Sequence, residues 1–244
     1  MSTIEAAAPA AAAPPAPPAP PADRATLLLG GGCAIVGAVG TVIVNLMHPL
    51  PPPGTEGLLR VVAATPHWPM IHFGAIYSAL FILGGLVGLA HSLTGAASRA
   101  LGRWGLAVAT VGVAVMVVGL TIDGSSSKRL ADAWMATGAQ DQATMLQAID
   151  AVIAVEMSEF GAWASIGLGL SFVIFGMAVA LGRDYPRWAG WVAVAAGAGC
   201  FVVGADRFLL AERLVQYFPW FAFVVSAWTA FMGVLMLRRA RTAA

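Results

Sequence analysis

The chain has 244 residues, of which 59% are hydrophobic and only 10% are charged. This composition excludes a soluble globular domain of the same length. The formal net charge of +1 at pH 7 gives no basic surface for nucleic acid, so no nucleic-acid partner is expected.

The N-terminal segment, residues 1–23, consists almost entirely of Ala and Pro. It lacks the basic stretch followed by an apolar run that a signal peptide carries. Its composition predicts a disordered cytoplasmic tail that favours polyproline II conformations.

Apolar segments fill the rest of the chain, residues 24–241, and each is long enough to cross a membrane, which takes about 20 residues. The predicted spans are residues 25–47, 70–90, 103–122, 159–182, 187–205 and 219–237. No Asp, Glu, Lys, Arg or His lies in the middle of a span. The sequence therefore predicts an all-α, polytopic bundle of six transmembrane helices, without the charged midplane site that many transporters carry.

Basic residues in the loops indicate the orientation of the bundle. With the N-terminus inside, the inner side carries Arg24, Arg99, Arg103, Arg183, Arg187, Arg238, Arg239 and Arg241, and the outer side carries Arg60, Lys128, Arg129, Arg207 and Arg213. This bias predicts cytoplasmic termini. A helical bundle favours the bacterial inner membrane over the outer membrane, where barrels are the rule.

The loop between the third and fourth spans predicts an amphipathic cap on the outer face, residues 123–158. Asp123-Gly124 is typical of a helix stop. After it, residues 128–137 place apolar side chains on one helical face, and residues 140–158 continue such a pattern into the fourth span. We expect a short interfacial helix and an outward extension of the fourth helix.

Glycines recur seven residues apart on the third and fifth spans and predict faces where helices pack closely. They are Gly105, Gly112, Gly119, Gly190, Gly197 and Gly204. The segments Arg103-Trp104-Gly105 and Arg187-Trp188-Ala189-Gly190 also resemble each other. An internal repeat would stack three helical hairpins about an axis normal to the membrane.

Four short motifs relate the chain to a known group of proteins. They are His48-Pro49, Trp68-x3-His72, Asp123-Gly124-x3-Lys128-x-Leu130-Ala131-Asp132-Ala133-Trp134 and Tyr185-Pro186-Arg187-Trp188. Over about residues 25–205 the chain resembles a group of uncharacterised bacterial six-helix integral membrane proteins. The resemblance implies a six-helix membrane fold and carries no known activity, cofactor or partner.

Histidines and carboxylates gather near the outer ends of the predicted spans. The candidate ligands are His48, His67, His72, Asp123, Glu156 and Glu159. Imidazole and carboxylate groups together bind zinc, copper or non-haem iron. A haem held between His48 and His72, with Arg60 near a propionate, is a second interpretation. A third is an interfacial belt of polar and aromatic side chains with no ligand, because no diagnostic spacing such as HExxH occurs.

Three classes of function are compatible with these features. The first is a non-catalytic accessory, assembly or ligand-sensing subunit that contacts the lipid bilayer and either other membrane-protein subunits or a second copy of itself. The second is an interfacial metal-dependent enzyme that acts on lipid, with Glu159 as general base. The third is a passive transporter of a neutral solute. We expect the first class, and the outward-facing cluster of histidines and carboxylates is its candidate metal or haem site, with the interfacial belt as the alternative.

Overall fold

The computed structural model describes residues 23–50, 52, 54–209 and 213–242. Within these residues all regular structure is helical, and six helical segments are long and apolar enough to cross a membrane. They are Arg24–Met47, Trp68–Ser92, Ala96–Ala136, Ala139–Leu181, Arg187–Phe208 and Val215–Thr242. The prediction of an all-α polytopic bundle is confirmed. The predicted tail lies outside the described residues, apart from Asp23, which caps the first helix by accepting a hydrogen bond from the Thr26 amide.

The elements follow one another with short connections. In chain order they are α1 (Arg24–Met47), α2 (Thr55–Ala64), α3 (Trp68–Ser92), α4 (Ala96–Thr121), the π-helix η1 (Ile122–Ser127), α5 (Lys128–Ala136), α6 (Ala139–Trp163), the π-helix η2 (Ala164–Leu170), α7 (Ser171–Leu181), α8 (Arg187–Phe208), the 3₁₀ turn η3 (Val215–Tyr217) and α9 (Phe218–Thr242). The third span is longer than predicted because it begins at Ala96 and continues through η1 into α5, whereas the fourth is extended by the first part of α6.

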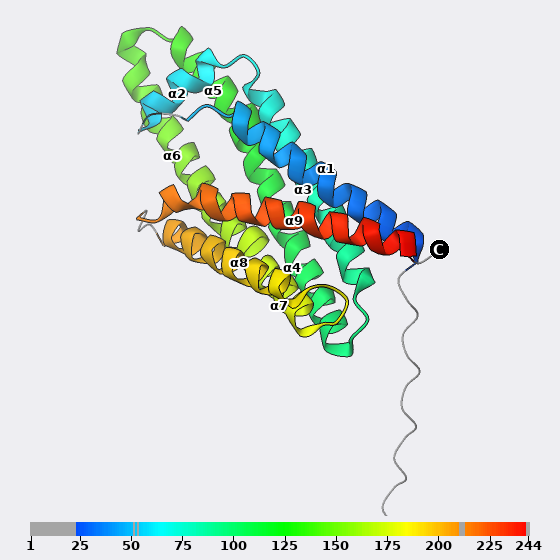
Figure 1. Ribbon diagram of the computed structural model, residues 1–244. Coiled ribbons are helices and arrows are strands. Elements are labelled where there is room, and N and C mark those ends of the chain that lie inside the picture. Colours follow the sequence, from blue (N-terminus) through cyan, green and yellow to red (C-terminus); the bar gives the residue numbers. More distant parts are fainter. Residues whose placement is uncertain (1–22, 51, 53, 210–212, 243–244) are drawn as a thin grey trace, which may run out of the picture.

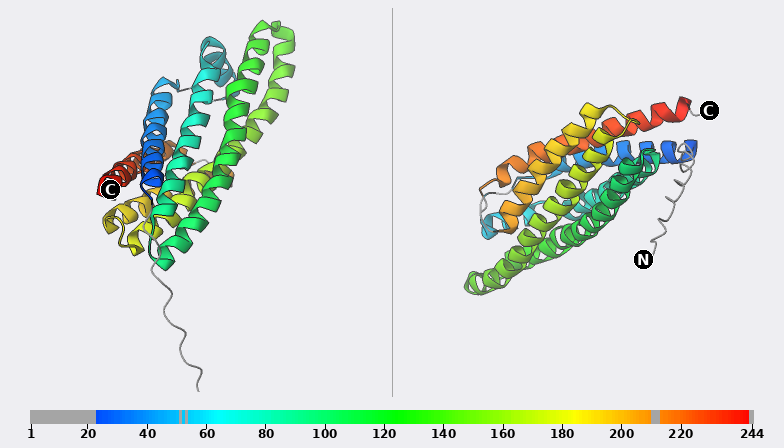
Figure 2. Two further views of the ribbon diagram at one scale, coloured as in Figure 1. Left: turned by 90° about the vertical axis from the view of Figure 1, so that its right-hand side faces the viewer. Right: turned by 90° about the horizontal axis from the view of Figure 1, so that it is seen from below.

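The spanning helices form a closed ring in chain order. Helix α1 packs against α3 and α9, α4 packs against α3 and α7, and α8 packs against α7 and α9. Figures 1 and 2 show α1 and α9, the first and last helices, side by side. Large apolar side chains such as Leu29, Phe73 and Phe223 are exposed on the outside of the ring, as expected for a surface covered by lipid. The three hairpins succeed one another around the ring, and their internal repeat stays a prediction.

Helices α2 and α5 cover one end of the bundle (Figure 1), which we call the α2–α5 end. A separate small core joins α2 and α5 to α3 and α6, and its buried members are Leu59, Val62, Trp68, Ala131, Trp134 and Ile149. The short helix expected near residues 128–137 is present as α5, and the expected extension of the fourth span is the first part of α6. Helix α2 was not expected from the sequence.

The interpretation of Asp123-Gly124 as a helix stop is wrong. The chain passes through both residues as η1 and continues into α5. The indole Nε1 of Trp68 donates a 2.9 Å hydrogen bond to the Asp123 carbonyl oxygen, and Gly124 packs against the side chain of His72. Contacts with α3 therefore stabilise a wide helical turn at Asp123-Gly124, where this dipeptide alone would favour the end of the helix.

The six glycines noted above all face a neighbouring helix. An added Cβ atom would meet Phe175 from Gly105, Gly167 from Gly112 and Glu159 from Gly119. It would meet Ala180 from Gly190, Gly169 and Val173 from Gly197, and Ser165 from Gly204. Backbones can approach each other at such positions because no side chain separates them.

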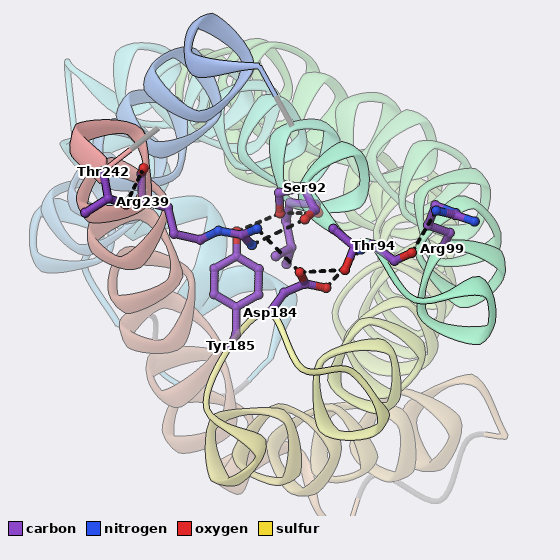
Figure 3. Close-up of polar contacts among 8 residues, drawn as sticks. Ser92, Thr94, Arg99, Asp184, Tyr185, Arg239 and Thr242 are labelled. Carbon is purple, nitrogen blue, oxygen red and sulfur yellow. Dashed lines mark hydrogen bonds and ion pairs between the residues drawn. The ribbon is translucent and has the colours of Figure 1, made fainter. Parts of the chain in front are cut away.

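A polar network joins the chain at the opposite end of the bundle (Figure 3). Asp184 accepts 2.9 Å hydrogen bonds from the amide and the hydroxyl of Thr94, and it forms an ion pair with Arg239. The Tyr185 hydroxyl lies 2.6 Å from Ser92 Oγ, and the Arg239 guanidinium lies 5.1 Å from the Tyr185 ring centroid. Burial raises the pKa of the Tyr185 hydroxyl, which keeps it neutral. The network ties the α3–α4 and α7–α8 connections to the end of α9.

Candidate metal centre and its cavity

Three of the candidate ligands converge at the α2–α5 end. His48 follows the last residue of α1, His72 lies in the second turn of α3, and Asp123 lies in η1. Each offers one ligand atom, and these atoms lie within 4.8 Å of one another. Ligand atoms about 2.1 Å from one metal ion are at most about 4.2 Å apart, so a small contraction would complete a site. His48 can supply this movement because it lies outside the helix.

The hydrogen bonds of His72 define which of its ring nitrogens is free to bind. Nδ1 lies 2.9 Å from the Trp68 carbonyl oxygen, which only accepts, so Nδ1 carries the hydrogen. In a neutral ring Nε2 is then unprotonated, and it faces Asp123 Oδ2 at 2.8 Å. Two acceptors in contact repel each other unless a proton or a cation neutralises them. A histidine that donates one N–H to a carbonyl and offers its other nitrogen is the usual arrangement of a metal ligand.

His48 has the same arrangement. Its Nδ1 lies 3.0 Å from the Pro49 carbonyl oxygen, which leaves Nε2 unprotonated in the neutral ring. The His48 ring contacts Trp68 and His72, with centroids 4.7 and 5.3 Å away. Burial, and secondly the neighbouring His72, lower the pKa of His48, while Asp123 opposes this shift. The neutral imidazole that a metal requires is therefore favoured near pH 7.

A cavity of about 350 Å³ opens from this group into the middle of the ring. His48, His72, Asp123, Glu156 and Glu159 line its polar end. Most of the remaining lining is apolar, including Ala79, Ile82, Leu86, Ala109, Phe172 and Val225, and Thr41, Asn45 and Ser226 add polar groups. The polar group therefore lines part of a mostly apolar cavity, an arrangement typical of small-molecule sites.

Two further carboxylates differ in their surroundings. Glu156 is 5% exposed, and its Oε2 accepts a 3.0 Å hydrogen bond from Ser127. Glu159 packs against Gly119, and its buried Oε1 has no hydrogen-bond partner among the described residues. Neither carboxylate belongs to the group of three. Both can act on a molecule that enters the cavity.

The remaining candidates lie elsewhere. His67 is exposed at the start of α3 and is outside the group. Arg60 is bonded to Glu56 on the same helix and lies over the Trp134 ring. The haem interpretation stays a prediction, and it would require rearrangement, because the His48 and His72 rings meet edge to face with centroids 5.3 Å apart and Asp123 lies in front of His72 Nε2. A single metal ion fits the donor set of two imidazoles and one carboxylate.

Trp68 and Gly124, which contact the group, and Ser127, which bonds to Glu156, were not predicted as site residues. The Trp68-x3-His72 spacing carried a usable signal, because a residue four positions earlier in a helix places its carbonyl near the His72 ring. The other two depend on the π-helix, for which the sequence gives no comparable signal.

A scan against protein-family models, a search of curated proteins and a search of solved structures each found no match to this chain.

Proposed function

We propose that this chain is an integral membrane protein that binds one transition-metal ion through His48, His72 and Asp123. The single observation that carries the proposal is the contact between His72 Nε2 and Asp123 Oδ2, with Nδ1 already engaged by a carbonyl. A metal ion bound by both His72 Nε2 and Asp123 Oδ2 would remove the repulsion between these two acceptors. Two histidines and one carboxylate leave coordination positions open, as in zinc and non-haem iron(II) sites.

His48, His72 and Asp123 all line the cavity, so a metal ion held by them would form part of a ligand-binding site. We propose the role of a non-catalytic ligand-sensing or accessory subunit, in which an occupied cavity is signalled to a partner subunit or a second copy. Gentle extraction followed by mass determination of the intact assembly tests this role. A lone monomer without a partner would contradict it.

A metal-dependent enzyme that acts on lipid is the second candidate. The observation that favours it is the unpartnered Oε1 of Glu159 in the cavity wall, because a general base needs a free carboxylate oxygen near the metal. Turnover that disappears in Glu159→Gln while the metal stays bound would favour this candidate over the sensing role.

The membrane and the orientation belong to the same proposal. The basic residues of the loops favour cytoplasmic termini in the bacterial inner membrane, which would place the α2–α5 end outside. Replacement of Cys33 and Cys200 by Ala, followed by Ser126→Cys or Thr242→Cys, tests this in intact cells. An impermeant thiol reagent should label position 126 and spare position 242. The reverse pattern would contradict the orientation.

Metal analysis tests the central claim. Untagged protein, solubilised mildly and equilibrated with zinc, iron(II) or copper, should retain one ion per chain by elemental analysis. His72→Ala should lose the ion, whereas His67→Ala and His91→Ala, which alter histidines outside the group, should retain it. Retention in His72→Ala, or no retention in the unmodified protein, would overturn the proposal. A Soret band in the optical spectrum would restore the haem interpretation.

A further inference from the structure

Trp68 contacts all three proposed ligands of the metal ion. Its indole Nε1 donates a 2.9 Å hydrogen bond to the Asp123 carbonyl oxygen, and its own carbonyl oxygen lies 2.9 Å from Nδ1 of His72. Its ring packs against the His48 ring, with centroids 4.7 Å apart, and against the His72 ring at 4.8 Å. The three ligands come from three separate parts of the chain, so a single residue relates their positions to one another.

These contacts do not engage the atoms that the metal requires. The bond to Asp123 ends on its backbone carbonyl, not on its carboxylate, and the bond to His72 engages Nδ1, not Nε2. Groups that hold ligands in this way fix the orientation of the ligands, and their loss typically weakens metal binding about 10–100-fold. Trp68 therefore has the position of a group that orients ligands without being a ligand itself.

The same side chain is built into the small core at the α2–α5 end. Trp68 is 1% exposed and belongs to one buried cluster with Leu59 of α2 and Trp134 of α5. Lys128 joins these two helices, because its Nζ donates a 3.1 Å hydrogen bond to the Ala63 carbonyl oxygen near the end of α2. Movement of α2 and α5 away from α3 would open the core around Trp68. The position of the indole thus depends on how α2 and α5 pack.

We propose that Trp68 is a positioning residue that couples the packing of α2 and α5 to metal binding at His48, His72 and Asp123. The inference rests on the proposed metal site and adds a means of regulation to it. Coupling between two equilibria is reciprocal. A bound metal ion therefore stabilises the packing of α2 and α5, and displacement of these helices weakens metal binding.

Removal of the indole donor tests the contact with Asp123. Trp68→Phe keeps an aromatic ring in the small core but cannot donate to the Asp123 carbonyl, so it should weaken zinc binding at least about tenfold. Trp228→Phe is the matched control, because Trp228 is 3% exposed and its Nε1 donates a 2.7 Å hydrogen bond to the Ala189 carbonyl in the other core of the bundle. Both variants lose one buried indole hydrogen bond. Trp228→Phe should leave the zinc affinity unchanged.

Cobalt(II) in place of zinc gives a readout that a loss of stability alone does not move. The visible absorption bands of bound cobalt report the geometry of its ligands. At saturating cobalt these bands should shift in Trp68→Phe and should match those of the unmodified protein in Trp228→Phe. An unchanged cobalt spectrum together with an unchanged zinc affinity in Trp68→Phe would overturn the proposal.

The reverse direction of the coupling is measured in the unmodified protein, so it does not depend on the folding of a variant. Zinc should slow amide hydrogen exchange at least about fivefold in α2 and α5, residues 55–64 and 128–136. The connection at residues 182–185, at the opposite end of the bundle, should exchange equally with and without zinc. Equal exchange of α2 and α5 in the two states would contradict the coupling.

Loosening of the small core tests the same coupling from the side of α2. Leu59→Ala changes none of the ligands but removes a fully buried side chain from this core, and it should weaken zinc binding at least about fivefold. Leu89→Ala is the control, since Leu89 is 1% exposed in the other core, at the far end of α3. An equal loss of zinc affinity in both variants would show a general effect of destabilisation and would refute the coupling.

Metal content separates the two proposals. Unmodified protein that retains no zinc overturns the proposed function, and the inference falls with it. One zinc ion per chain, with hydrogen exchange in α2 and α5 unaffected by zinc or with equal zinc affinity in Trp68→Phe and Trp228→Phe, overturns the inference alone.

Discussion

Gly124 lies directly against the Cβ atom of His72, so that a side chain at position 124 would separate η1 from α3. The contact is between two elements that hold different ligands of one proposed metal ion. The absence of a side chain at Gly124 is thus what allows Asp123 to reach His72.

The first prediction concerns this contact. Gly124→Ala should weaken metal retention at least about tenfold, a change of about 1.4 kcal/mol, because His72 and Asp123 move apart. Gly138→Ala is the matched control, since a Cβ there meets nothing within 4 Å. Elemental analysis after dialysis against a graded chelator measures the effect. Equal retention in both variants would contradict the role of the contact.

The second prediction concerns pH. Because burial lowers the pKa of His48, its imidazole should stay neutral in the folded metal-free protein to a pH below the ordinary histidine pKa of about 6.5. In the metal-free protein the unfolded chain takes up a proton at the ordinary pKa, whereas folded His48 does so only at the lower pKa. The free energy of unfolding should therefore decrease as the pH falls between the two values. His48→Gln should flatten this dependence in a chemical denaturation series, and His67→Gln should not.

The third prediction concerns the buried carboxylate of Glu156. Ser127→Ala removes the donor to its Oε2 and should lower the free energy of unfolding by about 1 kcal/mol or more, since the acceptor stays buried. Ser126→Ala, on the exposed side of the same π-helix, should change it by less than about 0.5 kcal/mol. Denaturation of both variants in the same detergent compares them. A larger loss in Ser126→Ala would be inconsistent with this account.

The fourth prediction concerns the packing of α1 on α3. A Cβ on Gly30 would lie 2.6 Å from the Gly88 Cα atom, so Gly30→Ala should force the helices apart and destabilise the protein by about 1–3 kcal/mol. Gly32, two residues further on, has nothing within 4 Å of an added Cβ. Gly32→Ala should be neutral or stabilise the helix by up to about 1 kcal/mol. Thermal unfolding of both variants measures the sign of each stability change. Equal changes in Gly30→Ala and Gly32→Ala would refute the close approach of Gly30 to Gly88.

The fifth prediction concerns the polar network at the opposite end. Tyr185→Phe removes the hydroxyl bonded to Ser92 and should cost about 1 kcal/mol of stability. Tyr77→Phe removes an exposed hydroxyl and should cost less than about 0.5 kcal/mol. Because the network lies at the other end of α3 from His72, neither variant should change metal retention. A change in metal content of Tyr185→Phe would show that the two ends are coupled.

Hydropathy was sufficient to predict the spans, because an apolar run of this length has few alternatives to a membrane-spanning helix. Helix α2 was missed although Glu56 and Arg60 are four residues apart and form an ion pair on its surface. The preceding Pro51-Pro52-Pro53-Gly54 run indicates a turn or linker, and this signal outweighed the helical spacing of Glu56 and Arg60. The π-helix η1 was missed because contacts with Trp68 and His72, which are distant in sequence, override the local preference of Asp123-Gly124.

For the site, residue type and position at a helix end were enough to select His48, His72 and Asp123 as candidates. Their convergence depends on the packing of α1 and η1 against α3 and on the winding of η1, which no local pattern reports. His67 is of the same residue type and only five positions from His72, yet it is exposed at the helix start. Sequence alone could not separate the two histidines.

The contact between α1 and α9 also has a consequence for biogenesis. A chain synthesised from its N-terminus delivers α9 last, so α1 waits in the membrane with one flank uncovered until translation is nearly complete. Arg239, which joins Ser92 and Asp184, arrives at the same moment. A chain that ends before α9 therefore leaves an open ring in which Asp184 lacks its ion pair with Arg239.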